Sequence, residues 1–148
     1  MKKAYKNILV AVDGSKEAEW ALEQAIHQAS LSGAKIFLTH IIDNKNLTAL
    51  EMYDHSATQS LLKYAEQLLQ DCLAKVKEAG IENVETVLEY GSPKVKISKD
   101  LVKAHSIDLI ICGATGLNAM ERFLIGSVSE NIVRHAKCDV LIVRTPQE

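Results

Sequence analysis

Residues 107–144 read IDLIICGATGLNAMERFLIGSVSENIVRHAKCDVLIVR, and this stretch decides the fold. The apolar run at 108–112 predicts a buried strand, and a glycine-containing segment at 113–127 follows it directly. A helical pattern then begins near Ser127 and extends to about His135, before a second apolar run at 140–143. A strand, a helix and another strand in this order are typical of a parallel sheet.

The same alternation recurs toward the N-terminus. Apolar runs predict strands at 7–13, 35–42 and 84–90, and helical patterns cover 16–32, 57–79 and about 93–105. Gly33 and Gly80 are placed to end two of the helices, while Ser92 and Pro93 suit the N-cap and first position of another. Residues 43–56 predict a loop with a helical turn. The alternation at 84–90 predicts a strand at the sheet edge. The pattern indicates one α/β domain over 1–148, with a five-stranded parallel sheet covered by helices on both faces.

Composition excludes several classes of protein. The chain has 148 residues, a net charge of −2 and a pI near 6.2, so it lacks the basic surface expected of a nucleic-acid-binding protein. No apolar run reaches the roughly 18–20 residues that a membrane span needs. The three cysteines are odd in number and form no CxxC pair, which favours buried thiols in a reducing cytoplasm.

Two predicted strands end in residues suited to a ligand. The first ends in Asp13, and the fourth ends in Gly113; if these strands are neighbours, a crevice lies between their carboxyl ends. Gly113, Gly116 and Gly126 allow a positive φ or a close backbone approach. The hydroxyl of Ser127 and the N–H groups of Val128 and Ser129 then lie at a helix N-terminus, where phosphate binds well.

Each of these residues also has a structural interpretation. Ser127 and Glu130 fit a capping box, and Asp13 fits either a helix cap or a contact to ribose or to a phosphate-bound Mg²⁺. Arg122 is the one cation between Gly113 and Ser127, and suits phosphate neutralisation or plain solvation. His40 lies in an apolar strand and is expected to be a hydrogen-bonded core histidine.

Several catalytic signatures are absent from the sequence. It contains no Walker loop, no GxGxxG dinucleotide fingerprint, and no metal-ligand spacing among its histidines. An activated nucleophile cannot be named, so the sequence indicates no catalytic residue.

With these residues in view, the chain resembles the universal stress proteins. The resemblance is carried by ILVAVDGS at 8–15, LTHIID at 38–43, GSP at 91–93 and, above all, by residues 113–144. The glycine spacing is similar to the G-2x-G-9x-G-(S/T) motif of the family's ATP-binding branch. The resemblance implies a Rossmann-like sheet with strand order 3-2-1-4-5, which makes the first and fourth strands neighbours.

The resemblance also implies a set of binding residues. Ala11, Val12 and Asp13 would line the nucleotide cleft, and the backbone of Ile41 would meet adenine. Gly113 and Gly116 would border ribose and phosphates, while the triphosphate would be held by Gly126, Ser127, Val128 and Ser129. Many relatives carry a basic or imidazole side chain where this chain has Thr115, which leaves more of the phosphate charge to backbone amides, Arg122 or a metal ion.

The function implied is that of a cytoplasmic, ATP-binding stress-response protein that forms a homodimer through Asp139–Arg144. Nucleotide would order residues 113–127 and change a surface that partners recognise. Two other hypotheses stay open at this point. One is a slow ATP hydrolase or nucleotidyl-transfer enzyme, and the other is a dimerising scaffold that binds no nucleotide.

Overall fold

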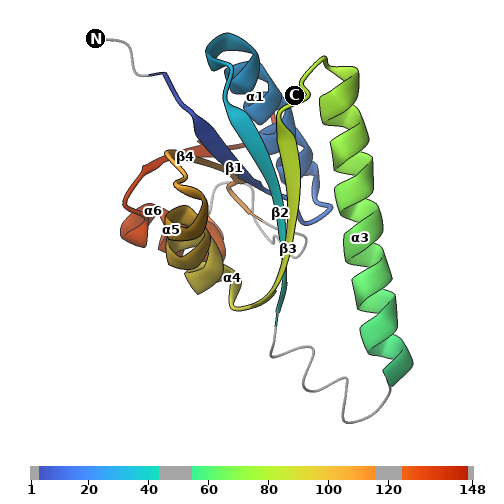
Figure 1. Ribbon diagram of the computed structural model, residues 1–148. Coiled ribbons are helices and arrows are strands. Elements are labelled where there is room, and N and C mark those ends of the chain that lie inside the picture. The colour runs from blue at the N-terminus through green and yellow to red at the C-terminus, as the bar shows by residue number, and fades with distance from the viewer. Residues whose placement is uncertain (1–3, 44–54, 116–124, 147–148) are drawn as a thin grey trace.

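The computed structural model describes residues 4–43, 55–115 and 125–146. Five parallel strands form one sheet in the order β3-β2-β1-β4-β5 (Figure 1). Their bounds are β1 Asn7–Ala11, β2 Lys35–Asp43, β3 Val84–Gly91, β4 Leu109–Gly113 and β5 Asp139–Val143. The strand order implied by the resemblance is confirmed. β1 and β4 are therefore neighbours, and the alternating strand β3 lies at an edge as its pattern predicted.

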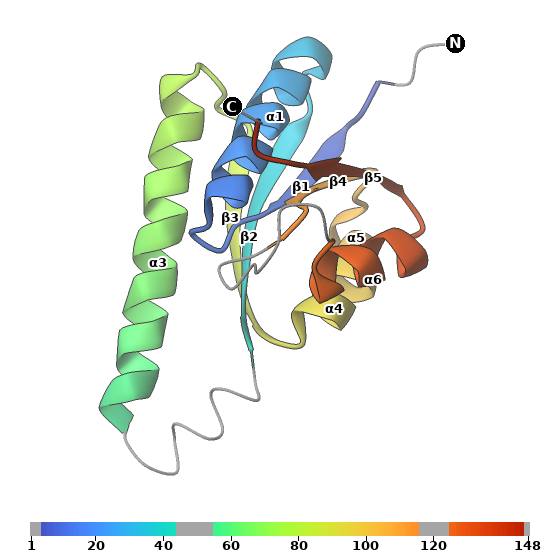
Figure 2. The same cartoon turned by 180° about the vertical axis from the view of Figure 1, so that it is seen from behind.

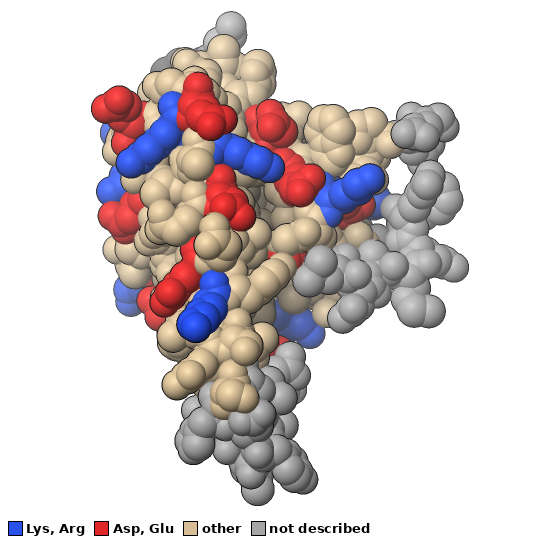
Figure 3. Space-filling view, turned by 90° about the vertical axis from the view of Figure 1, so that its right-hand side faces the viewer, with Lys and Arg blue, Asp and Glu red and all other residues tan. Residues whose placement is uncertain are grey.

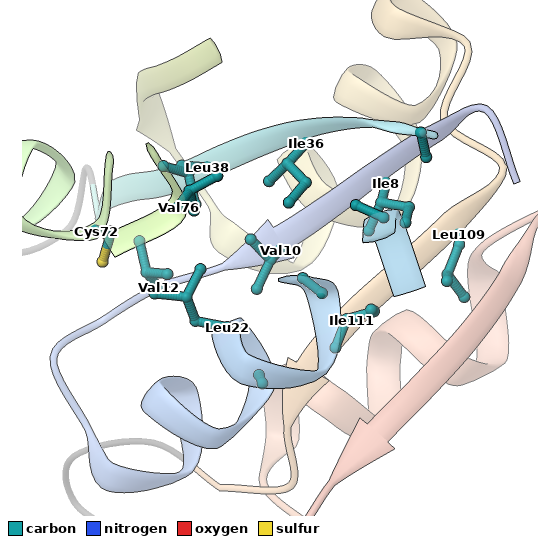
Figure 4. Close-up of a cluster of buried hydrophobic side chains, with 14 of the residues drawn as sticks. Ile8, Val10, Val12, Leu22, Ile36, Leu38, Cys72, Val76, Leu109 and Ile111 are labelled. Carbon is teal, nitrogen blue, oxygen red and sulfur yellow. The ribbon is translucent and has the colours of Figure 1, made fainter. Parts of the chain in front are cut away.

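Helices cover both faces of the sheet (Figures 1 and 2). One face carries α1 (Lys16–Ser32) and α3 (His55–Glu78), and the other carries α4 (Pro93–Val95), α5 (Leu101–His105) and α6 (Ser127–His135). A π-helical turn, η1 (Lys96–Asp100), joins α4 to α5. Two hydrophobic clusters result, one on each face; Figure 4 shows the cluster beneath α1 and α3, in which Ile8, Val10 and Ile36 are fully buried.

The helix ends follow from local backbone chemistry. Gly33 and Gly80 adopt φ values of 74° and 89°, which a residue with a side chain rarely adopts, and each follows a helix. The helix α3 begins at His55, two residues before the expected start at 57. The expected loop at 43–56 lies mostly outside the described residues.

The helix predicted at about 93–105 differs from a regular α-helix in its middle turn. Residues 96–100 form the π-helical turn, in which Ile97 and its neighbour Ser98 are both buried. A π turn inserts one extra residue, so two consecutive residues can face the sheet. Apolar spacing alone does not reveal such an insertion, which in the folded chain lies against α6.

The sequence excluded membrane-spanning and nucleic-acid-binding proteins, and the helices and the surface of the structure bear on both classes. No helix in the described ranges is long and apolar enough to cross a membrane. The face that bears α3 shows acidic and basic side chains interspersed, with no large area of one sign (Figure 3).

Candidate functional site

The candidate site lies where β1 and β4 end. These strands pair in parallel from Ile8↔Leu109 to Val10↔Ile111, so their carboxyl ends lie side by side. Asp13 follows β1, and Gly113 is the last residue of β4. This is the edge at which open α/β sheets bind ligands, at the point where the strand order reverses.

Asp13 begins a tight turn into α1. Its Oδ1 accepts a hydrogen bond of 2.9 Å from the N–H of Ser15, and the hydroxyl of Ser15 accepts one of 3.1 Å from the N–H of Ala18. Ser15 is therefore the N-cap of α1, and the interpretation of Asp13 as the cap is wrong. The phenol of Tyr64, on α3, lies over this turn and donates to the carbonyl oxygen of Asp13 at 3.4 Å. Gly14, between Asp13 and Ser15 in the turn, has φ +87°, and the Tyr64 phenol leaves no room for a side chain there.

The N-terminus of α6 is uncapped by any side chain. Gly126 is the N-cap residue, with φ −66° and ψ 160°, and it makes no side-chain cap hydrogen bond. Ser127 is consequently the first helical residue and not the cap, so the capping box with Glu130 is not formed. Glu130 instead pairs with Arg134 at 3.0 Å. Within the described residues, the first N–H groups of this helix have no side-chain partner, which is the state that suits an anion.

Gly113 and Gly126, the two glycines of the motif within the described residues, have different surroundings. A Cβ on Gly113 would lie 2.8 Å from the Cβ of Glu17 and 3.0 Å from its carbonyl carbon. The first turn of α1 therefore leaves room only for a glycine at position 113. A Cβ on Gly126 would meet Ala114 O at 3.4 Å and the Cα of Thr115 at 3.5 Å, which are ordinary contacts. Gly113 thus serves helix packing, whereas neither backbone angle nor described contacts require a glycine at 126.

Hydrogen bonds hold α6 against the end of β4. The hydroxyl of Ser129 donates to the carbonyl oxygen of Gly113 at 2.6 Å, and the N–H of Gly126 donates to the carbonyl oxygen of Ala114 at 2.7 Å. The start of α6 is therefore fixed beside the crevice. The Ser129 side chain is buried in this contact, so of its polar groups only the backbone N–H, in the first turn of α6, is left without a hydrogen-bond partner among the described residues.

A further side chain reaches this place from α1. Glu17 is 9% exposed, and its Oε2 accepts hydrogen bonds from the N–H of Thr115 at 2.5 Å and from the Thr115 hydroxyl at 2.8 Å. Sequence reasoning missed Glu17 and Tyr64 as residues of this region. The one signal for Glu17 was Gly113, since a glycine that permits close approach implies a neighbour, but the sequence does not name that neighbour.

The remaining cleft residues contribute backbone and shape. Val12 packs its side chain in the core, its N–H donates to Thr39 O at 2.9 Å, and its carbonyl oxygen lies 2.7 Å from Nδ1 of His40. His40 is thus hydrogen-bonded as predicted, but it is half-buried and is not a core residue. Ala11 and Ile41 pack in the cluster on the α5 and α6 face.

The backbone of Ile41 lies past the end of β1. The pairing of β1 with β2 stops at Ala11↔Thr39, while β2 continues beside β3 as far as Asp43↔Gly91. The β1-facing edge of Ile41 therefore borders the crevice. Gly116 and Arg122, the other two predicted binding residues, lie outside the described residues.

A single five-stranded parallel sheet in the order 3-2-1-4-5, with helices on both faces, defines a Rossmann-like α/β protein. The sequence model of the universal stress protein family matches residues 4–144, and the chain belongs to that family. It is 51% identical over 143 residues to a Staphylococcus haemolyticus protein assigned to the universal stress proteins, covering 97% of this chain and 87% of the relative.

Solved structures of universal stress proteins are also similar to this chain. UspA from Lactobacillus plantarum is 32% identical with a TM-score of 0.86, covering 97% of this chain and all (100%) of that one. A universal stress protein in complex with cAMP is 27% identical with a TM-score of 0.71, at the same coverage of 97% and 100%. Both share the fold described above.

Proposed function

We propose that this protein binds adenine nucleotides, ATP among them, in the crevice between the ends of β1 and β4. One observation carries the proposal: α6 begins at a glycine that the described contacts do not require, with N–H groups that no side chain caps. A glycine leaves these amides open to phosphate oxygens. A family relative of 27% identity that binds a cyclic adenine nucleotide supports the choice of ligand.

Residues that the structure describes are available for both the adenine end and the phosphate end of the nucleotide. Adenine would lie against the backbone of Ile41, and the phosphates would bind the N–H groups of Ser127, Val128 and Ser129. Ala11, Val12, Asp13 and Gly113 would form the floor between them.

Asp13 fits the Mg²⁺ that accompanies ATP. One of its carboxylate oxygens is held by the N–H of Ser15, and the other has no hydrogen-bond partner among the described residues. No cluster of three or more metal-ligating side chains occurs in the described ranges. The phosphates would therefore supply most of the ion's ligands, with Asp13 as the protein's contribution.

The test is calorimetric titration of nucleotide-stripped protein with ATP. We expect micromolar binding, and we expect Gly126→Val to abolish it while circular dichroism and thermal melting show a folded protein. Gly116→Val is expected to have the same effect on binding. If both variants bind ATP as tightly as the parent protein, the proposed pocket is wrong.

The biological consequence proposed is regulation in the cytoplasm. Nucleotide would order residues 113–127, and the changed surface would be recognised by partner proteins in a stress response. Hydrogen exchange over 113–127 with and without ATP tests this step, and equal exchange rates in the two states would contradict it.

We also propose that the protein is a homodimer joined through Asp139–Arg144. The strand β5 is an edge of the sheet, and Val140, Leu141 and Ile142 along it are half-buried in one chain. An apolar edge strand is a ready surface for a second chain.

A further inference from the structure

Glu17 places a negative charge at the phosphate end of the proposed site. Its carboxylate is nine-tenths buried, and a single oxygen, Oε2, accepts both the N–H and the hydroxyl of Thr115. Charge-assisted hydrogen bonds of this kind hold a carboxylate in one position. Glu17 is in the first turn of α1, close to the partial positive charge of that helix end.

The residue that Glu17 holds adjoins the N-terminus of α6. The Cα of Thr115 lies 3.5 Å from the position that a Cβ would take on Gly126, the N-cap of that helix. Ala114, one residue earlier, accepts the N–H of Gly126. A phosphate bound to the first amides of α6 would thus lie near the Glu17 carboxylate, and salt would screen the repulsion between the two charges.

No described cation cancels this charge. Lys35 pairs with Glu85, Lys96 with Asp100 and Arg134 with Glu130, so none of these cations pairs with Glu17 or Asp13. Neither Glu17 nor Asp13 therefore has a basic partner in the described ranges. Among the described residues, the phosphate end thus contains two carboxylates without a basic partner, beside the backbone amides of α6, while Arg122 lies outside the described residues.

We propose that Glu17 is a specificity-determining residue that weakens nucleotide binding in proportion to the negative charge of the phosphate chain. The inference rests on the proposed function and adds a ligand preference to it. The site favours adenosine monophosphate over metal-free ATP. Mg²⁺ restores ATP binding because it neutralises part of the negative charge of the triphosphate, which then is repelled less by the Glu17 carboxylate.

Glu17→Gln isolates the charge. Both hydrogen bonds from Thr115 reach one oxygen, so the carbonyl oxygen of glutamine can accept both while the negative charge is lost. The matched control is Glu19→Gln, which makes the same change in net charge at an exposed position in the same helical turn. Dissociation constants for AMP and ATP are measured by calorimetry, once with EDTA and once with excess Mg²⁺.

We expect the ratio of the ATP to the AMP dissociation constant, measured in EDTA, to fall about fivefold in Glu17→Gln. The ratio should change less than about twofold in Glu19→Gln, since exposed charges interact weakly through water. Excess Mg²⁺ should bring the parent's ratio close to that of Glu17→Gln.

Two outcomes would overturn the inference, and they are distinguishable. If AMP binds and the ratio is the same in both variants, Glu17 does not set the preference, while the proposed function stands. If no adenine nucleotide binds the parent protein, the proposed function fails and the inference fails with it. If Glu17→Gln does not fold, the salt dependence of the parent protein is measured instead. Added salt should lower the ratio of the ATP to the AMP dissociation constant, because it screens the repulsion from Glu17. A ratio that rises with salt overturns the inference.

Discussion

Gly113 shows how a single residue can serve packing where a ligand role was expected. The sequence suggested that Gly113 leaves room for phosphate, yet the nearest atoms to a Cβ there belong to Glu17, at 2.8 Å and 3.0 Å. The backbone of α1 cannot shift as cheaply as a side chain. The glycine therefore permits close contact between β4 and the first turn of α1.

Gly113→Ala is expected to lower the free energy of unfolding by about 1–3 kcal/mol, the usual cost of overpacking a core. Urea denaturation followed by circular dichroism measures it. Gly126→Ser is the control, because a Cβ there meets atoms no closer than 3.4 Å and serine is at least as good an N-cap as glycine. Equal losses in the two variants would contradict the packing argument.

Cys112 is a second residue whose environment fixes its chemistry. Burial raises the pKa of its thiol from its ordinary value near 9 to about 11, and the hydrogen bond with Ser129 opposes this only in part. The native thiol is therefore protonated at pH 8, and iodoacetamide should alkylate the half-exposed Cys138 long before Cys112. Mass spectrometry of the modified peptides checks the order, and rapid native alkylation of Cys112 would disprove it.

The same shift has a defined sign for stability. Between about pH 9 and 11 the native state keeps a proton on Cys112 that the unfolded state releases. Stability should therefore fall as pH rises through this window. Cys112→Ala should remove that part of the loss.

At the scale of elements, two serines that look alike in sequence cap their helices differently. Ser15 and Ser92 both precede a helix in extended conformation, but only the Ser15 hydroxyl accepts a hydrogen bond from its helix. Ser92 is followed by Pro93 and the three-residue α4, whereas Ser15 is followed by the 17-residue α1.

Ser15→Ala is expected to cost about 1 kcal/mol of stability, the typical cost of losing a side-chain cap. Ser92→Ala is the matched control and should cost only a few tenths of that, since no cap hydrogen bond is lost. Thermal melting of the two variants under one buffer compares them. A larger loss for Ser92→Ala would show that the Ser15 cap is not what stabilises α1.

At the scale of the whole molecule, the strand β5 offers one open edge for assembly. Val143 directs its carbonyl oxygen to Ala114, beyond the end of β4, at 2.9 Å. Because alternate residues of a strand direct their backbone groups to opposite sides, Leu141 also faces β4, while Val140 and Ile142 face outward. The outward groups are the ones that a second chain would pair with.

Ile142→Pro should convert the proposed dimer to a monomer and leave the fold intact, because proline is tolerated where the N–H faces away from the sheet. Leu141→Pro should instead destabilise the fold, since it removes a hydrogen bond to β4. Sedimentation velocity gives the oligomeric state, and circular dichroism gives the folding. A parent protein that sediments as a monomer, or an Ile142→Pro variant that stays dimeric, would rule out this interface.

Much of the architecture could be predicted from local sequence. Strand and helix positions agree within about two residues, because apolar periodicity and glycine φ preferences act over a few neighbouring residues. The π turn at Lys96–Asp100 could not be predicted, since the apolar spacing of 93–105 is equally compatible with a regular α-helix. In the site, the sequence identified the helix start near Ser127 but left Asp13 and Ser127 open as helix caps, where the structure has the Ser15 cap and an uncapped start at Gly126.

The sequence by itself determined the order of strands and helices, the helix ends at Gly33 and Gly80, and a glycine segment leading into a helix. Only the tertiary structure decided what each site residue contacts. The hydrogen bond that Thr115 donates to Glu17 joins positions 98 residues apart, and the glycine at 113 permits the same approach of α1 to β4. Hydrogen-bond partners at this range depend on how packed elements meet in space, and no local pattern records that meeting.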